Sequence, residues 1–101
     1  MVKHIILWTL RDGIAPAERD EILHNIKEGL EGLKGRIPGL VDIHVQTAGR
    51  LATSNADLML DSTLESPEAL AAYAAHPLHV AVAAQQVKPH TVQRVCLDFE
   101  V

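Results

Sequence analysis

The sequence VKHIILWTL at residues 2–10 carries the strongest structural signal in this chain. Most of its residues are apolar, and many are β-branched or aromatic, which favours an extended conformation. A nearly continuous apolar run of this kind predicts a central strand that is buried on both faces. Because side chains alternate along a strand, His4 and Trp8 are predicted to lie on one face, and Ile5 and Leu7 on the other. His4 is therefore expected among large apolar side chains.

Helical and strand segments follow this strand along the chain. Pro16, with acidic residues soon after it, predicts a helix start, and apolar residues then recur at helical spacing. Ser66-Pro67-Glu68 predicts a second helix start, with a capping hydroxyl before a proline at the first helical position. The predicted elements are a helix over 16–35, strands over 40–45 and 56–62, a helix over 67–75, a further helical segment over 77–87 and a strand over 91–99.

This order of elements, β-α-β-β-α-β, is typical of an α+β domain of the ferredoxin-like kind with an antiparallel sheet. The helices of such a domain cover one face of the sheet and leave the other face bare. The chain has 101 residues and is 48% hydrophobic, so we expect a partner to cover that face. We therefore predict one domain over residues 1–101, and a homodimer in which two copies press sheet to sheet.

Charge and composition argue against several classes of partner. The formal net charge is -4, and the Lys and Arg residues are scattered, so the basic patch of a nucleic-acid-binding protein is missing. The first apolar run is too short to span a membrane and lacks a signal-cleavage pattern. Cys96 is the single cysteine, and we interpret it as a packing residue of the last strand. We expect a cytoplasmic protein that binds neither nucleic acid nor membrane.

A phenol and two imidazoles surround a proline within residues 73–79. An imidazole can exchange a proton near neutral pH, and a phenol can hydrogen-bond an oxygen, so Tyr73 and His79 could form an acid–base site. A plainer interpretation is also open, because His76-Pro77 is a common way to end one helix and start the next, with His76 as the cap.

Four parts of the sequence together resemble the stress-responsive dimeric α/β-barrel family, known as Dabb. They are residues 2–6, the helix start at 66–70, the block from Tyr73 to His79 and the closing Asp98. The most specific part is the tyrosine followed by His-Pro-x-His, and the resemblance extends over nearly the whole chain. It implies a dimeric α/β barrel, in agreement with the order of the predicted elements.

The resemblance also implies a chemistry. A plant polyketide cyclase of this family closes a ring by an aldol-type reaction without a metal or organic cofactor. Tyr73 and His79 fall at the positions of its catalytic tyrosine and histidine, and His4 matches a histidine that lines its pocket. By this resemblance His79 would remove a proton next to a carbonyl, while Tyr73 would hydrogen-bond the oxygen that becomes negative. The implied ligand is a small hydrophobic carbonyl compound or polyketide, and no cofactor is implied.

Trp8 and His76 join His4 as candidate substrate-binding residues. Trp8 shares the strand face of His4, although a core position is the plainer interpretation. His76 and His79 form an H-x-x-H pair, but no third ligand is close in sequence, so we predict no metal site and no metal requirement. Arg50, in the loop between the second and third strands, is interpreted as a solvated arginine.

Three functions stay open from the sequence. The first is a pocket for a hydrophobic carbonyl compound, with cyclase or lyase chemistry that needs no cofactor. The second is a non-catalytic stress-associated or structural dimer, whose filled interior would leave no cavity. The third is a cofactor-independent oxygenase, as found in related α/β-barrel families. Whether the chain is an enzyme is left open, and the space beside His79 is the place to decide it.

Overall fold

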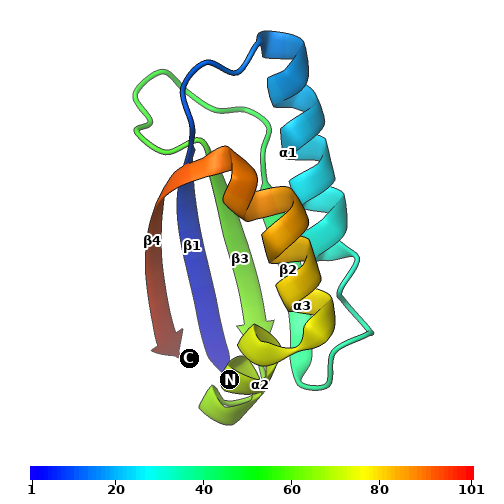
Figure 1. Ribbon diagram of the computed structural model, residues 1–101. Helices are drawn as coiled ribbons and strands as arrows, with labels where there is room; N and C mark the ends of the chain where they lie inside the picture. The colour runs from blue at the N-terminus through cyan, green and yellow to red at the C-terminus, as the bar shows by residue number, and fades with distance from the viewer.

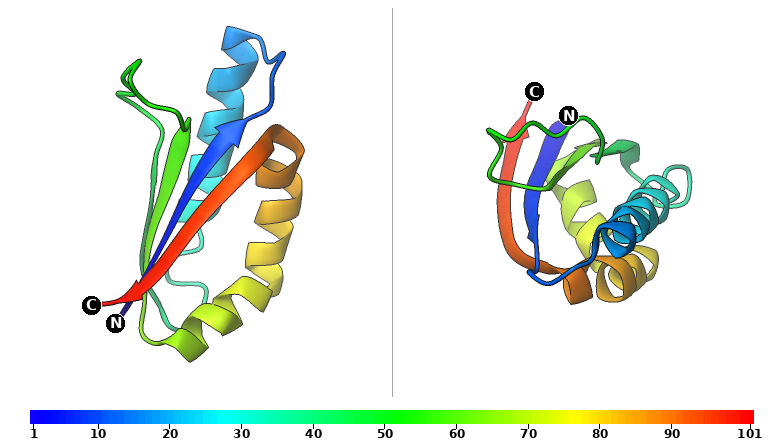
Figure 2. Two further views of the ribbon diagram at one scale, coloured as in Figure 1. Left: turned by 90° about the vertical axis from the view of Figure 1, so that its left-hand side faces the viewer. Right: turned by 90° about the horizontal axis from the view of Figure 1, so that it is seen from above.

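A computed structural model describes all residues from 1 to 101. Four strands form one antiparallel sheet in the order β2-β3-β1-β4 (Figure 1). Figure 2 shows that the helices all pack on one face of this sheet, which is the predicted α+β ferredoxin-like arrangement. The elements are β1 (Val2–Leu10), α1 (Pro16–Glu31), β2 (Leu40–Gln46), β3 (Leu58–Leu64), α2 (Pro67–Ala75), α3 (Pro77–Val82), a π-helical turn η1 (Ala83–Val87), a 3₁₀ turn η2 (Lys88–His90) and β4 (Thr91–Glu100).

β1 lies between β3 and β4, and its side chains alternate as predicted. His4 and Trp8 are buried on the face that the helices cover. The prediction of burial on both faces is wrong for the single chain, because no layer covers the other face. Leu7 on that face keeps 39% of its surface exposed, and Ile5 is only partly buried.

α1 starts at Pro16 as predicted and buries Ile26 and Leu30 along one stripe. The predicted end at residue 35 is too late, because the helix ends at Glu31. The turns that follow place Gly35 at φ +81°, a left-handed conformation that glycine adopts without strain and that does not continue a helix. None of the helices combines the length and the apolar character needed to cross a bilayer.

β2 and β4 lie close to their predicted positions, whereas β3 begins at Leu58 and not at residue 56. The cause is Asp57, which is tied to β1. Its backbone N–H donates to the carbonyl of Trp8 at 2.8 Å, and its carboxylate accepts from the N–H of Leu10 at 2.8 Å. The strand starts only after this anchor, and it extends further at its other end than predicted.

The helix start at Ser66 is confirmed, since its hydroxyl accepts a hydrogen bond from the N–H of Ala69 at 3.0 Å. α2 ends at Ala75, and His76-Pro77 separates it from α3 as predicted. α3 continues into η1, and π-helical turns of this kind occur often beside functional sites.

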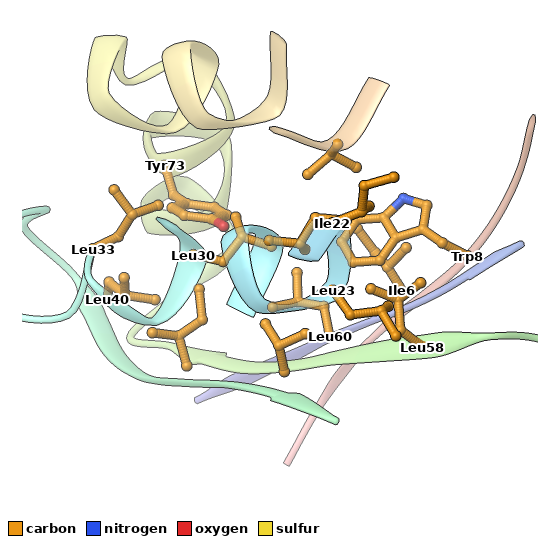
Figure 3. Packing of buried hydrophobic residues seen from close by; sticks show 14 of the residues in the cluster. Ile6, Trp8, Ile22, Leu23, Leu30, Leu33, Leu40, Leu58, Leu60 and Tyr73 are labelled. Carbon is orange, nitrogen blue, oxygen red and sulfur yellow. The ribbon is translucent and has the colours of Figure 1, made fainter. Parts of the chain in front are cut away.

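The hydrophobic core lies between the helices and the sheet. Figure 3 shows Tyr73 beside Leu33 at one end of the cluster, and Trp8 beside Leu58 at the other. Burying a side chain of this size contributes about 1.5–3 kcal/mol. Tyr73 is therefore fixed by the same packing that stabilises the fold.

The sheet face opposite the helices is apolar toward β4. Val95, Leu97 and Phe99 are 56%, 63% and 41% exposed. Leu7 of β1 stands opposite Val95 on the same face. Toward β2 this face becomes polar, with His44 opposite an aspartate of β3. The single chain thus exposes an apolar patch over β1 and β4 of the kind that a protein partner covers.

Candidate functional site

A cavity of about 360 Å³ lies between the β1–β4 half of the sheet and the helical segments from α2 to η1. Its volume falls in the range of pockets that hold small molecules. The interior therefore contains a cavity, whereas the structural alternative predicts a filled interior. Tyr73 and His79 line the cavity from the helices, and His4 and Trp8 line it from β1. The other lining residues are Ile6, Leu30, Leu60, Ala74, Val80, Ala83, Val87, Lys88, Thr91 and Arg94.

Tyr73 and His79 contact each other in this cavity. The centroids of their rings are 4.4 Å apart, and the ring planes are tilted by 45°. Tyr73 belongs to α2 and His79 to α3, so the break at Pro77 decides how the two side chains meet. The structure thus brings together the two candidate catalytic residues of the sequence.

The ring of His79 is oriented by a backbone carbonyl. Its Nδ1 lies 3.1 Å from the carbonyl oxygen of Ala74. Because a carbonyl only accepts, Nδ1 carries the hydrogen and Nε2 keeps its lone pair. Burial lowers the pKa of His79, and the nearby charges of His4, Arg94 and Lys88 lower it further, against the opposing effect of the Ala74 hydrogen bond. A neutral imidazole with a free Nε2 can accept a proton at neutral pH.

Tyr73 is fully buried, and its hydroxyl has no hydrogen-bond partner in the chain. Burial raises the pKa of Tyr73 to about 12, so the phenol stays protonated and can donate a hydrogen bond. Leaving a buried polar group without a partner costs about 1–3 kcal/mol. A ligand oxygen that accepts from this hydroxyl would remove that cost.

His4 forms part of the sheet-side wall and pairs with Asp98 across the β1–β4 ladder. Its Nδ1 contacts the carboxylate of Asp98 directly, which fixes the orientation of the ring and favours a hydrogen on Nδ1. The rings of His4 and Tyr73 stand edge to face with centroids 6.2 Å apart. Sequence reasoning assigned Asp98 only to the family pattern, because its contact with His4 depends on the register of two strands from opposite ends of the chain.

His4, Cys96 and Asp98 form a group whose potential ligand atoms lie within 4.8 Å of one another. Cys96 is exposed, with its thiol 3.5 Å from the carboxylate of Asp98, so its interpretation as a packing residue is wrong. His4 and Asp98 hydrogen-bond directly to each other. As arranged, the three side chains contact one another in one cluster.

His76 does not line the cavity. Its Nδ1 accepts the N–H of Leu78 at 3.1 Å and caps α3. The two rings of the H-x-x-H pair therefore have different partners and do not converge on a shared ligand. Trp8 combines both interpretations of the sequence, because it is buried in the core and also lines the cavity.

Lys88 and Arg94 also line the cavity, and sequence reasoning passed over both. The alternation of the last strand could have indicated Arg94, because it stands opposite Trp8 and therefore shares the face of the cavity. Lys88 is the first residue of η2, between η1 and β4, a position that no sequence pattern marks.

A larger hollow of about 440 Å³ lies between the loop of residues 47–57 and Leu7 of the bare sheet face. Arg50 in this loop donates to two carbonyls of the loop at 2.8 and 2.9 Å and pairs with Asp57 at 3.5 Å. Arg50 thus closes the loop on itself and is more than a solvated arginine. Because the charged groups of this hollow satisfy each other, its size alone does not make it a binding site.

Comparison with known proteins identifies the family pattern. The family defined by the stress responsive A/B barrel domain, Dabb, matches residues 2–101 of this chain. The stress-response A/B barrel domain-containing protein HS1 of Arabidopsis thaliana is 33% identical over 82 residues, which make up 78% of this chain and 71% of HS1. The resemblance inferred from the sequence is thereby confirmed.

Two solved structures share the fold along almost the whole chain. A dimeric protein of unknown function with a ferredoxin-like fold from Bacteroides fragilis is 29% identical and superposes with a TM-score of 0.90, over 99% of this chain and 95% of that one. A dimeric ferredoxin-like protein of unknown function from Thermobifida fusca is 25% identical with a TM-score of 0.79, over 99% of this chain and 90% of that one. Both similar proteins are dimeric and have a ferredoxin-like fold.

Proposed function

The chain belongs to the stress-responsive A/B barrel domain family, and we propose that its cavity binds a small hydrophobic carbonyl compound and moves a proton on it without a cofactor. His79 is the base, and Tyr73 binds the oxygen that becomes negative. One observation carries the proposal. A neutral imidazole and a buried phenol without a partner share one cavity, with ring centroids 4.4 Å apart.

The proposed reaction uses groups that are already in place. The lone pair on Nε2 of His79 takes a proton from the carbon next to the substrate carbonyl, and the electrons of that C–H bond move onto the carbonyl oxygen. The hydroxyl of Tyr73 donates a hydrogen bond to the resulting enolate. The enolate carbon then attacks a second carbonyl of the same molecule, a C–C bond forms, and the new alkoxide takes the proton back from His79. No electrons are gained or lost, so the reaction needs no oxidant.

The rest of the cavity supports a hydrophobic substrate. Trp8, Leu30 and Leu60 supply apolar walls around the two polar groups. His4, fixed by Asp98, closes the sheet side beside Tyr73. The substrate body would thus lie against the core while its carbonyl faces Tyr73.

The function is tested by a screen of short polyketide thioesters and β-dicarbonyl compounds with the purified protein. We expect turnover of at least one of them, and loss of that turnover in His79→Gln. Equal rates for the two proteins would reject His79 as the base. Oxygen consumption in proportion to product would support the oxygenase alternative, and absence of any binding in the cavity would support a non-catalytic dimer.

We also propose that the chain is a homodimer built on its bare sheet face. Val95, Leu97 and Phe99 form an exposed apolar patch there, and the similar bacterial proteins are dimeric. Sedimentation of the wild type should give a dimer, and Leu97→Lys should give monomers. Ala84→Lys, on the exposed side of η1, is the control that should stay dimeric. A folded wild-type monomer at micromolar concentration would contradict the proposal.

A further inference from the structure

Most cations of this chain are paired with a carboxylate, and two of the exceptions lie at the cavity. Of the nine Lys and Arg residues, only Arg36, Lys88 and Arg94 have no carboxylate within 4.0 Å. Lys88 and Arg94 both line the cavity. The chain has more acidic than basic residues and a net charge of -4, so a shortage of carboxylates does not explain these unpaired cations.

The two cations approach the cavity from different walls. Arg94 lies on β4, on the face that it shares with Trp8. Asp98, which is further along the same face, is already engaged by His4. Lys88 follows directly after η1, on the helical side. The positive charges of Arg94 and Lys88 also lower the pKa of His79, although less than burial and His4 do.

We propose that the ligand of this cavity is an anion, with an apolar body beside Trp8 and a carboxylate or phosphate group that binds Arg94 and Lys88. This inference rests on the proposed function, since it names the class of compound that the same cavity takes. Guanidinium and ammonium groups form charge-assisted hydrogen bonds with such oxygens, and a guanidinium can bind them in a bidentate manner. With the anionic group fixed at these cations and a carbonyl at Tyr73, the orientation of the substrate toward His79 is also fixed.

Anion binding should change the proton affinity of His79. The charges of Arg94 and Lys88 disfavour a second positive charge on the imidazole, and a bound carboxylate or phosphate would neutralise them. By linkage, an anionic ligand raises the pKa of His79 and binds more tightly when that ring is protonated. A neutral ligand of the same shape lacks this effect.

Two fluorescent probes with similar aromatic bodies test the inference. Anilinonaphthalene sulfonate carries an anionic group, and N-phenylnaphthylamine is neutral. At low ionic strength we expect the anionic probe to bind about tenfold or more tightly than the neutral one. Ala83→Phe fills the cavity and should abolish the binding of both probes, whereas Ala84→Phe, on the exposed side of the same turn, should not.

Charge-removing variants locate the effect. The double variant of Lys88→Met and Arg94→Met should lose about tenfold in affinity for the anionic probe and keep its affinity for the neutral one. Arg36→Met together with Lys34→Met is the matched control, because it removes two exposed positive charges that do not line the cavity. If the two double variants bind the anionic probe alike, the inference is overturned while the cavity still binds ligands. If wild type binds neither probe in the cavity, the proposed function fails with it.

Displacement of the anionic probe by octanoate, monooctyl phosphate and octanol shows which anion is preferred. We expect octanoate or monooctyl phosphate, or both, to displace it more strongly than octanol. Proton NMR titration of the His79 ring, assigned by comparison with His79→Gln, should show a higher pKa with the stronger anion than with octanol. Equal displacement by all three compounds together with an unchanged His79 titration would overturn the anionic class.

Discussion

The cavity lined by Tyr73 and His79 and the hollow beside the loop of residues 47–57 differ less in volume than in whether their polar groups have partners. The larger one, of about 440 Å³, is bordered by Arg50 and Asp57, which pair with each other. The cavity, of about 360 Å³, is lined by Tyr73, whose buried hydroxyl has no partner in the chain, and by His79, whose Nε2 is free. A buried hydroxyl without a partner reduces stability, and in our proposal a ligand oxygen offsets this cost at Tyr73, whereas Arg50 and Asp57 pair with each other beside the larger hollow.

The largest expected effect comes from removing the base. His79→Gln keeps a side chain of similar length that can still donate to the Ala74 carbonyl, but an amide cannot accept the substrate proton. On any substrate found by the screen, kcat should fall by roughly two to four orders of magnitude, the range for one positioned acid–base group. The dimer and the affinity for the neutral probe should be retained.

His76→Ala is the matched histidine variant for that measurement. It removes the cap that Leu78 uses, so the free energy of unfolding should fall by about 1 kcal/mol. Because His76 does not line the cavity, its turnover should stay close to the wild-type rate. A loss of turnover as large as that of His79→Gln would show that the break between α2 and α3, and not the base, limits the reaction.

Tyr73→Phe should reduce the rate less, by about a hundredfold, because it removes one hydrogen bond to the developing negative charge and leaves the base in place. Its effect on stability should have the opposite sign. The hydroxyl of Tyr73 is buried without a partner, so its removal should leave the free energy of unfolding unchanged or raise it by about 1 kcal/mol. Urea unfolding and turnover of the same preparation measure both. A clear loss of stability would show that the hydroxyl already has a structural partner.

Asp57→Ala tests the larger hollow, and its effect should be confined to stability. The substitution leaves the N–H of Leu10 without an acceptor and removes a partner of Arg19 and Arg50. We expect a loss of about 2 kcal/mol in the free energy of unfolding. Asp57→Asn keeps an acceptor and should lose less. Probe binding in the cavity should be unchanged. A change in probe affinity would mean that the loop around the larger hollow influences the cavity.

Local patterns in the sequence predicted most of the fold, and the errors lie where the structure departs from those patterns. Period-two alternation over residues 2–10 and the start signals at Pro16 and Ser66 are local patterns, and they led to the correct order of elements and the correct fold. The end of α1 was missed because apolar residues continue at helical spacing to Leu33, whereas the helix ends at Glu31 and Gly35 takes a left-handed conformation. The start of β3 was missed because Asp57 bonds to β1, which is distant in sequence.

Some residues of the candidate site are brought together by a short motif, and others only by the pairing of β1 with β4. Tyr73 and His79 stand six positions apart on either side of one proline, so a short motif could place them together. Asp98 and Arg94 lie far along the chain from their neighbours on β1 and meet them only through the β1–β4 register. Residues whose role depends on such long-range pairing leave no local pattern, so sequence reasoning passed over Arg94 and noted Asp98 only as part of the family pattern.

The smallest expected effect is on the pH dependence of stability, and it separates a buried base from a solvated one. The pKa of His79 is lowered from its ordinary value of 6.5, chiefly by burial. As the pH falls below about 6.5, the unfolded chain therefore takes up this proton before the folded chain does, and the folded state loses stability. Above about 6.5 the contribution is fully present. Because the ring is only partly buried, the change should stay below the one-proton limit of about 1.4 kcal/mol per pH unit.

His79→Gln removes this component, so the difference in unfolding free energy between wild type and variant should be constant above about pH 7 and should change only toward lower pH. Urea unfolding of both proteins between about pH 8 and pH 5 measures it, and a difference that does not vary with pH would show that His79 is solvated like an ordinary surface histidine.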